Sequence, residues 1–248
     1  MRLQIADCYD ERRRDWTGMN FFALADLHLS NAVNKPMDVF GDRWKDHQQR
    51  IRDAWIDVVS QDDVVLLPGD ISWALTLAEA IPDLQWIARL PGKKLMIRGN
   101  HDYWWNGIGR VRKHLDAGMF AIQNDALSVG GYAVCGTRGW LLPSHPQFNA
   151  HRDDPLYRRE QERLRLSLRA AAKFNLPIVC MLHYPPLSHL GEDTLFTALL
   201  SEFEVRLCIY GHLHQAAHRY RFEGKKDGVE YLLVSSDYLG FRPLQLPL

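Results

Sequence analysis

Five apolar stretches of the sequence each end in side chains that can bind a metal ion or transfer a proton. The longest ending follows residues 95–97 and reads Arg98-Gly99-Asn100-His101-Asp102. The other four read Asp26-Leu27-His28, Gly69-Asp70, His183 and Gly211-His212-Leu213-His214. Carboxylates, an amide and imidazoles suit hard to borderline divalent ions. These five polar endings therefore indicate a metal site.

The apolar stretches themselves have the length and composition of buried β-strands. They cover residues 21–25, 64–67, 94–98, 178–182 and 205–210. Stretches with helical spacing follow several of them, at residues 44–59, 75–90, 108–115 and 194–203. Alternating strands and helices form parallel sheets, and sites lie beyond the carboxyl ends of such strands. We therefore expect the five polar endings to meet at one edge.

Each polar ending taken alone has an ordinary structural explanation. An Asp-x-His sequence after a strand is commonly a surface pair, Gly-Asp is a common turn, and Asn100 alone suggests a left-handed turn residue. Five such placements in one chain, with ligand types suited to the same class of ion, make coincidence a poor explanation.

The remaining segments predict a second set of strands. Short β-type stretches at residues 120–122, 126–129 and 132–135 indicate a hairpin or meander, followed by a loop to Pro155 and a long amphipathic helix from Tyr157. Three more β-like stretches lie at residues 217–222, 231–235 and 241–246, with a hairpin turn at 225–228. Pro82 is expected to break the helix at 75–90. One strand set alternating with helices and one largely antiparallel set predict two sheets packed face to face, with helices outside.

The chain has 248 residues, of which 46% are hydrophobic, enough for one core. Residues 1–18 show no clean periodicity, so we expect an N-terminal extension outside the core and a single domain over residues 19–248. Lys plus Arg and Asp plus Glu number 30 each, so no global positive field attracts nucleic acid or an anionic membrane, although a local basic groove stays possible.

The cysteines predict a reducing compartment. Cys8, Cys135, Cys180 and Cys208 form no Cys-x-x-Cys pair, and three of them lie in apolar stretches. No stretch approaches the ~18 apolar residues of a membrane span, and the N-terminus, which mixes acids with arginines, does not resemble a secretory signal. We expect a cytoplasmic protein without a membrane segment.

The five polar endings, in this order over residues 26 to 214, resemble the five-block signature of the calcineurin-like metallophosphoesterases. The resemblance implies an α/β protein, a four-layer α/β/β/α sandwich of two mixed sheets, with two divalent metal ions, of which manganese, iron and zinc are the main candidates. It implies that one ion is held by Asp26, His28, Asp70 and His214. It implies that the other is held by Asp70, Asn100, His183 and His212. Asp70 would bridge the two ions. Further stretches around Trp73, Trp104 and Trp140 look like a bacterial subgroup of predicted phosphohydrolases whose substrate is open.

The implied reaction is hydrolysis of a phosphomonoester or a phosphodiester. Two ions lower the pKa of a bridging water and clamp the phosphoryl oxygens, so that a bridging hydroxide attacks phosphorus. Asp70 serves this chemistry as the bridge, and His101 resembles the general acid for the leaving group. Asp102 either orients His101 or packs the loop.

Aromatic and cationic side chains on loops after the strands are candidates for substrate contact. Arg138 can donate two hydrogen bonds to a phosphate, and Trp104 is a second candidate. The alternative for the tryptophans is that they cover the sheet edge. The full set is Trp73, Tyr103, Trp104, Trp105, Arg138, Trp140 and Tyr184.

Two alternatives to a small-molecule phosphoesterase follow from the same residues. A nuclease of the superfamily would be expected to show a basic face or an added DNA-capping domain, and only about 34 residues follow His214. A non-catalytic scaffold would be expected to have lost ligands, whereas every ligand position is filled. A metallo-β-lactamase-type His-x-His-x-Asp-His run is absent from the sequence. The expected partner is a small phosphoester. Nucleic acid is disfavoured but open, and the sequence leaves the oligomeric state open.

Overall fold

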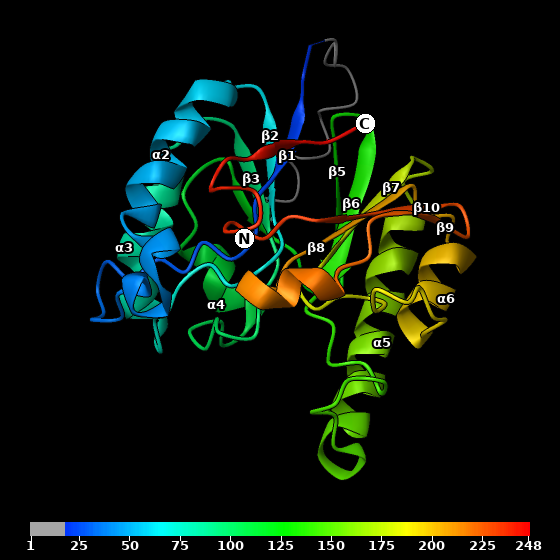
Figure 1. Ribbon diagram of the computed structural model, residues 1–248. Coiled ribbons are helices and arrows are strands. Elements are labelled where there is room, and N and C mark those ends of the chain that lie inside the picture. The colour runs from blue at the N-terminus through cyan, green and yellow to red at the C-terminus, as the bar shows by residue number, and fades with distance from the viewer. Residues whose placement is uncertain (1–17) are drawn as a thin grey trace.

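The computed structural model describes residues 18–248, so the predicted extension at residues 1–18 lies almost wholly outside the described residues. The strands form two sheets, which lie side by side in Figure 1. The five-stranded sheet has the order β11 (Leu244–Gln245), β1 (Phe21–Ala23), β2 (Val64–Leu67), β3 (Lys93–Met96), β4 (Met119–Ala121). The six-stranded sheet has the order β5 (Ala126–Val129), β6 (Tyr132–Thr137), β7 (Ile178–Leu182), β8 (Leu207–Tyr210), β10 (Val229–Leu233), β9 (Gly224–Lys226).

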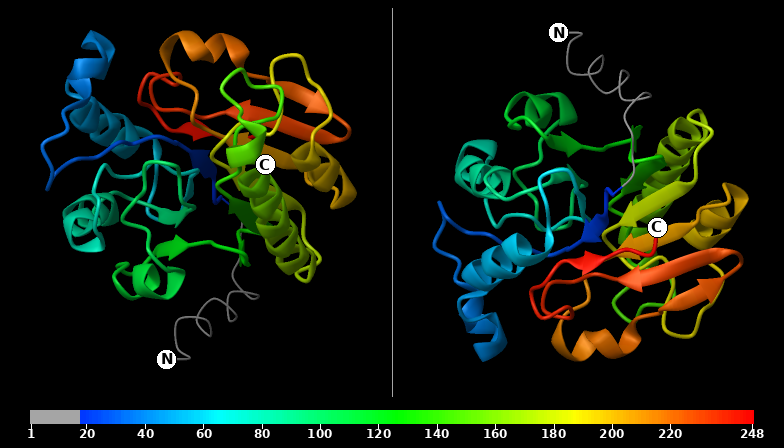
Figure 2. Two further views of the ribbon diagram at one scale, coloured as in Figure 1. Left: turned by 90° about the horizontal axis from the view of Figure 1, so that it is seen from below. Right: turned by 90° about the horizontal axis from the view of Figure 1, so that it is seen from above.

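Helices cover the outer face of each sheet. The five-stranded sheet carries α2 (His47–Val58), α3 (Leu77–Ala88) and α4 (Ile108–Lys113), and the six-stranded sheet carries α5 (Ala150–Ala172) and α6 (Leu195–Glu202). Figure 2 shows the same arrangement from below and above. The short 3-10 helices η2 (Met37–Phe40), η3 (Asp42–Trp44) and η4 (Gln215–Tyr220) lie in loops.

The strand pattern explains the layers, because successive side chains of a strand point to opposite faces. In β2, Val65 and Leu67 pack against the helices, whereas Val64 and Leu66 pack against the other sheet. In β7, Cys180 and Leu182 likewise face the helices and Val179 faces the sheet interface. The predicted four-layer α/β/β/α sandwich is confirmed.

The prediction of a largely antiparallel second strand set is wrong. Strands β6, β7, β8 and β10 pair in parallel, and only β5 and β9 at the sheet edges pair antiparallel. The hairpin at β5 and β6 is confirmed, but β4 pairs in parallel with β3 and so belongs to the other sheet. The β5–β6 and β9–β10 hairpins made the second strand set look antiparallel in the sequence. In the structure each hairpin contributes one antiparallel edge strand to a sheet whose inner strands are parallel.

Two prolines lie inside helices, whereas the sequence predicted a break or a second short helix at Pro82 and a loop as far as Pro155. Helix α3 continues through Pro82, and α5 begins at Ala150 and contains Pro155. A proline removes one backbone hydrogen bond of a helix, and both helices have side-chain caps at their N-termini, Thr76 with Glu79 in α3 and Asn149 in α5. The caps and the buried faces of both helices offset this local loss.

The prediction of a β-like stretch at residues 217–222 is also wrong, because residues 215–220 form the 3-10 helix η4. The hairpin of this region joins β9 to β10, and its turn lies at Asp227 and Gly228, both with positive φ. The strands at residues 231–235 and 241–246 are found as β10 and β11, with shorter or shifted limits.

Candidate metal centre

The five polar endings meet at the carboxyl ends of β1, β2, β3, β7 and β8, as the strand alternation predicts. Four residues in them have a left-handed backbone, with φ of 60° at Asp26, 47° at His28, 53° at Asp70 and 73° at His212. Such conformations are uncommon outside glycine and cluster at functional sites. These four residues therefore adopt locally unfavourable backbone conformations, which the surrounding fold holds in place and which position their side chains.

Two glycines let the chain pass close to the buried carboxylates. A Cβ added to Gly99 would overlap the carboxylate oxygen of Asp70 and lie 2.8 Å from its Cγ. A Cβ added to Gly211 would lie 2.6 Å from Oδ2 of Asp26. These contacts are too short for any larger residue, so the glycines fix the distance between neighbouring endings.

The first donor group consists of Asp26, His28 and His214, whose ligand-type atoms all lie within 4.8 Å of one another. The Nε2 atoms of His28 and His214 are 3.4 Å apart, and Nε2 of His214 is 3.7 Å from Oδ1 of Asp26. Three donors from β1 and β8 thus converge on one point.

The second donor group consists of Asp26, Asp70 and His183, again within 4.8 Å. Nε2 of His183 lies 3.4 Å from Oδ2 of Asp70 and 2.6 Å from Oδ1 of Asn100, which is also 2.9 Å from Nδ1 of His212. All seven residues of the predicted ligand set are therefore brought together. Asp70 Oδ2 also lies 3.8 Å from Nε2 of His28, so this carboxylate lies between the two groups, while Asp26 contributes to both.

Hydrogen bonds to the far ring nitrogens set the tautomers of two histidines. Nδ1 of His183 lies 3.0 Å from the Pro68 carbonyl oxygen, and Nδ1 of His214 lies 2.8 Å from Oδ1 of Asp237. When Nδ1 donates, the lone pair is on Nε2 and points at the carboxylates. This is the arrangement of metal-binding histidines.

The pKa shifts in the cluster follow from burial. Burial raises the pKa of Asp26 to about 6 and that of Asp70 well above its usual value. Burial also lowers the pKa of His212 to about 3 and those of His28 and His183 well below their usual range. Buried acids packed against neutral imidazoles are stabilised by a cation. The donor set therefore fits divalent ions.

Asp237 is a site residue that the sequence reasoning missed. Its buried carboxylate accepts from Nδ1 of His214 and, at 2.9 Å, from the backbone N–H of Gln215, and lies 3.2 Å from Nε2 of His218. Burial by itself lowers the pKa of His214, but Asp26 and Asp237 together raise it. Asp237 follows the apolar strand β10, so the same strand-ending pattern could have identified it.

His101 lies beside the two donor groups. Its ring packs 4.4 Å from the Trp73 ring and 5.8 Å from the His28 ring, measured between centroids. No hydrogen bond to this imidazole is found in the part of the chain that the structure describes, and burial lowers its pKa to about 4. The ring is therefore neutral and available to a substrate.

Asp102 braces the loops instead of orienting His101. Its Oδ1 accepts from the backbone N–H groups of Ile71 and Ser72 and from Nε1 of Trp104, and its Oδ2 accepts from the N–H of Gly99. Of the two interpretations offered for Asp102, loop packing agrees with these contacts.

The prediction that Trp104 binds substrate is contradicted. Its side chain is fully buried in the core under α4 and is tied to Asp102, so it covers the sheet edge. Arg138 keeps 12% of its side chain exposed, and its guanidinium stacks on Trp140 at 4.4 Å from the ring centroid.

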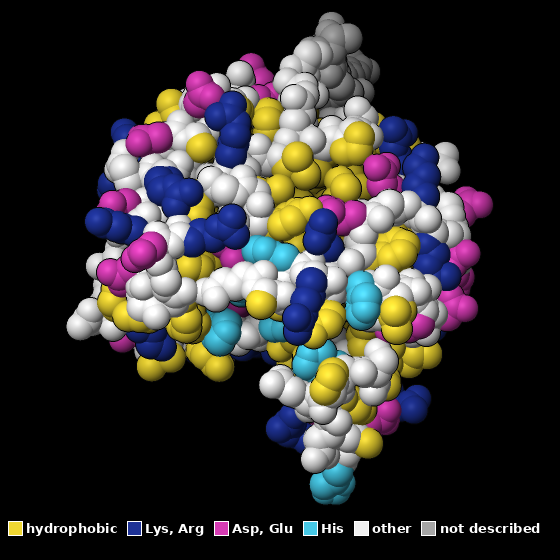
Figure 3. All heavy atoms as spheres, viewed as in Figure 1, with side chains coloured by type: hydrophobic (Ala, Val, Ile, Leu, Met, Phe, Trp, Pro, Cys, Tyr) yellow, Lys and Arg dark blue, Asp and Glu magenta, His cyan; other side chains and the backbone are white. Residues whose placement is uncertain are grey.

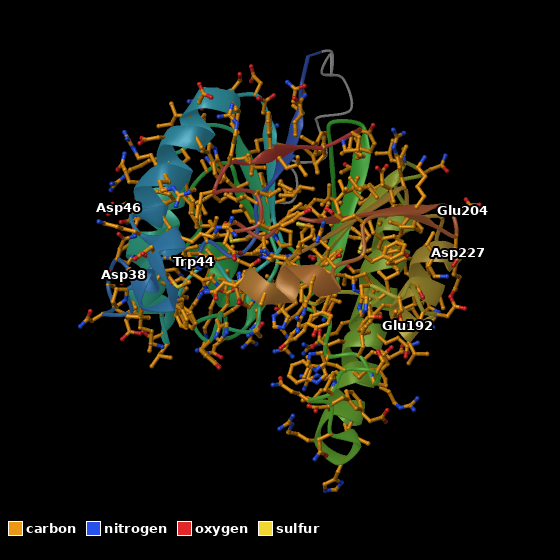
Figure 4. The ribbon with its side chains drawn as sticks, in the orientation of Figure 1. Asp38, Trp44, Asp46, Glu192, Glu204 and Asp227 are labelled. Carbon is orange, nitrogen blue, oxygen red and sulfur yellow. The ribbon has the colours of Figure 1, made fainter. Side chains whose placement is uncertain are left out.

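The rim of the centre is aromatic. Trp73 stacks on His28 at 4.8 Å, and Tyr184 packs on His212 at 4.0 Å between ring centroids. Trp44 at the end of η3, labelled in Figure 4, makes edge contacts with the rings of His28 and His214. In Figure 3, histidines reach the surface among Lys and Arg side chains on the face that η4 crosses. These rings restrict the movement of the imidazoles.

The chain is similar in sequence to a known protein family. A family model described as calcineurin-like phosphoesterase matches residues 19–216. In the residues that the structure describes, no helix has the length and apolar character needed to cross a bilayer.

Three relatives illustrate the range of similarity. The Gene 66 protein of Mycobacterium phage L5 is 36% identical over 83 residues, which cover 34% of this chain and 40% of the phage protein. The chain thus matches less than half of that relative's length. A probable cyclic nucleotide phosphodiesterase of Vesicomyosocius okutanii subsp. Calyptogena okutanii (strain HA) is 25% identical over 191 residues, 72% of each chain. The crystal structure of phosphopantetheinyl hydrolase from Mycobacterium tuberculosis shares the fold, with a TM-score of 0.55 at 14% identity over 92% of this chain and 95% of that chain. Because the family model spans most of the chain and all five polar endings, the protein belongs to the calcineurin-like phosphoesterase family.

Proposed function

We propose that this protein is a dinuclear metal-dependent hydrolase of phosphate esters. The observation that carries the proposal is the convergence of two buried donor groups that share Asp26, one with His28 and His214 and one with Asp70 and His183. Family membership and a relative named as a probable cyclic nucleotide phosphodiesterase support ester hydrolysis, and they make a phosphodiester the first substrate class to test.

We assign the ligands as the sequence resemblance implies. Asp26, His28, Asp70 and His214 would hold one ion, and Asp70, Asn100, His183 and His212 the other, with manganese, iron or zinc as the ions. When bound, two such ions supply a water of lowered pKa and neutralise charge on the phosphoryl group. The position of Asp70 between His28 and His183 supports its role as the bridge.

We assign His101 to the leaving group. Its ring lies beside the donor groups and lacks a hydrogen-bond partner among the described residues. A phosphate anion bound next to it would favour the protonated ring, which can give its proton to the oxygen that departs and return to the neutral form. Arg138 is assigned to a phosphate group of the substrate, because its guanidinium is close enough to Asp70 for its positive charge to lower that residue's pKa.

Residues 19–248 are proposed to form one domain, because β11 near the C-terminus pairs with β1 and completes the first sheet. A reducing, cytoplasmic setting is supported by three buried free cysteines, Cys135, Cys180 and Cys208. A nuclease or a non-catalytic scaffold remains the alternative that the following assay separates.

The test is turnover by the purified, manganese-loaded full chain of bis(p-nitrophenyl) phosphate, p-nitrophenyl phosphate, cyclic nucleotides and single-stranded DNA. We expect small esters to be hydrolysed, with activity lost on chelation and restored by Mn²⁺. Hydrolysis of DNA alone would favour the nuclease. No turnover of any ester by protein with two bound ions would favour the scaffold.

A further inference from the structure

A cavity of about 220 Å³ lies at the carboxyl ends of β3, β4 and β6, next to the metal centre. Its polar lining includes Arg98, Arg138, Arg163 and Glu160; we call it the arginine pocket. Pockets that enclose a whole small molecule usually measure ~300–1,000 Å³. The arginine pocket is smaller, so it suits one chemical group of a ligand.

The walls of the pocket carry more positive than negative charge. The buried Glu160 carboxylate accepts from Nη1 of Arg163 at 2.8 Å and from Nη2 of Arg138 at 3.3 Å. Thr137 Oγ1 donates to it at 2.7 Å. One carboxylate thus serves two guanidinium groups of the lining and fixes their positions.

Arg98 is the third arginine of the pocket, and Glu160 does not accept a hydrogen bond from it. In the described part of the chain it forms no ion pair, and its side chain is half-buried. Burial lowers the pKa of Arg138, Glu160 opposes this shift, and the charge of Arg98 adds to it. The two like charges therefore share a partly desolvated space, where an anion is worth more than in water.

Two buried donors of the pocket arginines lack acceptors. Nε of Arg98 and Nε of Arg138 are buried and have no hydrogen-bond acceptor among the described residues. Leaving such a donor unpaired costs free energy, most of all for a charged group. Oxygen atoms of an anion are the acceptors that guanidinium groups prefer.

The pocket is continuous with the proposed ligand loops. Arg98 precedes Asn100 by two residues, and the backbone oxygen of Arg138 accepts from the N–H groups of His183 and Tyr184 at 3.1 and 2.9 Å. The segments that carry the two arginines thus adjoin those that carry Asn100 and His183, which places the arginine pocket at the border of the metal centre.

We propose that the arginine pocket binds a second anionic group of the substrate, so that the substrate class is a phosphoester that carries a further phosphate or carboxylate. This inference rests on the proposed function for the first phosphoryl group. The part of the proposal that concerns the pocket is that it binds an anion, and anion binding can be measured without turnover.

The first measurement is calorimetric titration of inorganic phosphate into the full chain in the presence of a chelator. The variants are Arg98→Gln, Arg98→Lys and, as a control, Arg52→Gln, because Arg52 is exposed on α2 and, among residues 18–248, pairs only with its neighbour Asp53. We expect saturable binding to the wild type and to Arg52→Gln. Binding should weaken ~10- to 100-fold in Arg98→Gln, as for loss of a charge-assisted hydrogen bond, and recover in part in Arg98→Lys. Absence of saturable binding, or equal affinity in Arg98→Gln, would overturn the proposal.

The second measurement separates a substrate group from a free anion. The matched substrates are thymidine 5′-(p-nitrophenyl phosphate) and its 3′-phosphorylated form, compared by kcat/KM in the manganese-loaded protein. We expect the wild type to prefer the second substrate, and Arg98→Gln to lose ~10-fold more on the second than on the first. Phosphate binding that depends on Arg98, together with equal treatment of the two esters, would mean that the pocket takes a free anion and would refute the substrate class. Failure of every ester to turn over would refute the proposed function, while the calorimetric result would still decide the pocket.

Discussion

A substitution at Asp237 tests the proposed metal centre selectively, because this carboxylate orients His214, a ligand of one of the two proposed ions. Its carboxylate fixes His214 through Nδ1 at 2.8 Å and the following backbone N–H at 2.9 Å. In Asp237→Asn, one carboxylate oxygen becomes an NH₂ group. The amide can then accept from His214 or from Gln215, but not from both with good geometry. The tautomer of His214 with a free Nε2 lone pair is no longer enforced.

The expected cost follows from what such outer partners contribute. Loss of a hydrogen bond that orients a metal-binding histidine typically weakens metal affinity or activity by ~10- to 100-fold, which is about 1.4–2.7 kcal/mol. Only the ion bound by His214 should be affected, because the donor group of His183 is oriented by Pro68 instead.

The assay is calorimetric titration of Mn²⁺ into chelator-treated protein. We expect two binding steps in the wild type and a selective weakening of one step in Asp237→Asn. Asp193→Asn is the matched control, because Asp193 is exposed and its one ion pair within the described part of the chain is with Lys226. Unchanged affinities in Asp237→Asn, or equal weakening of both steps, would refute the assigned role of Asp237.

Three further predictions test other parts of the account. Gly99→Ala should lower manganese affinity at least ~10-fold because the new Cβ overlaps the Asp70 carboxylate, whereas Gly109→Ala, whose Cβ meets no atom within 4 Å, should bind normally; equal metal contents by mass spectrometry would contradict this. His101→Gln should keep both ions and lose ~10²- to 10⁴-fold on alkyl esters but much less on nitrophenyl esters, and a ratio independent of leaving-group acidity would remove His101 from the acid role. A chain that begins at Met19 should fold and turn over like the full chain, since β1 begins at Phe21; loss of soluble, active protein would show that the extension packs on the core.

The architecture was predictable from the sequence because its signals are local. The apolar stretches that become β1, β2, β3, β7 and β8 are buried on both faces, so they appear as continuous runs. The sheet to which β4 belongs was harder to predict, because this short strand comes directly before the β5–β6 hairpin in the sequence and was grouped with it. In the structure β4 pairs in parallel with β3, the strand that precedes α4. The helix limits near Pro82 and Pro155 were mispredicted, because the packing of each helix outweighs the single backbone hydrogen bond that its proline removes.

The metal centre was predictable for its ligand types and much less so for their supports. Asp26 and His214 are ligand-type residues that follow apolar strands. Asp237 also follows an apolar strand, but its role depends on the contact with His214, which only the folded structure reveals. Trp104 shows the opposite error, because residue type and loop position suggested a surface contact and the side chain is instead in the core. Sequence patterns indicate which residues follow strands, but only packing decides where a side chain on such a loop points.

The most direct test of the central claim is electron paramagnetic resonance of the manganese-loaded protein together with metal analysis. If Asp70 bridges two ions about 3.5–4 Å apart, the wild type should contain two Mn²⁺ ions per chain and show the spectrum of an exchange-coupled pair. Asp70→Asn should lose that coupling and at least one ion while keeping its fold. A wild-type spectrum of isolated Mn²⁺ alone, or an unchanged coupled pair in Asp70→Asn, would contradict the assignment of a dinuclear centre bridged by Asp70.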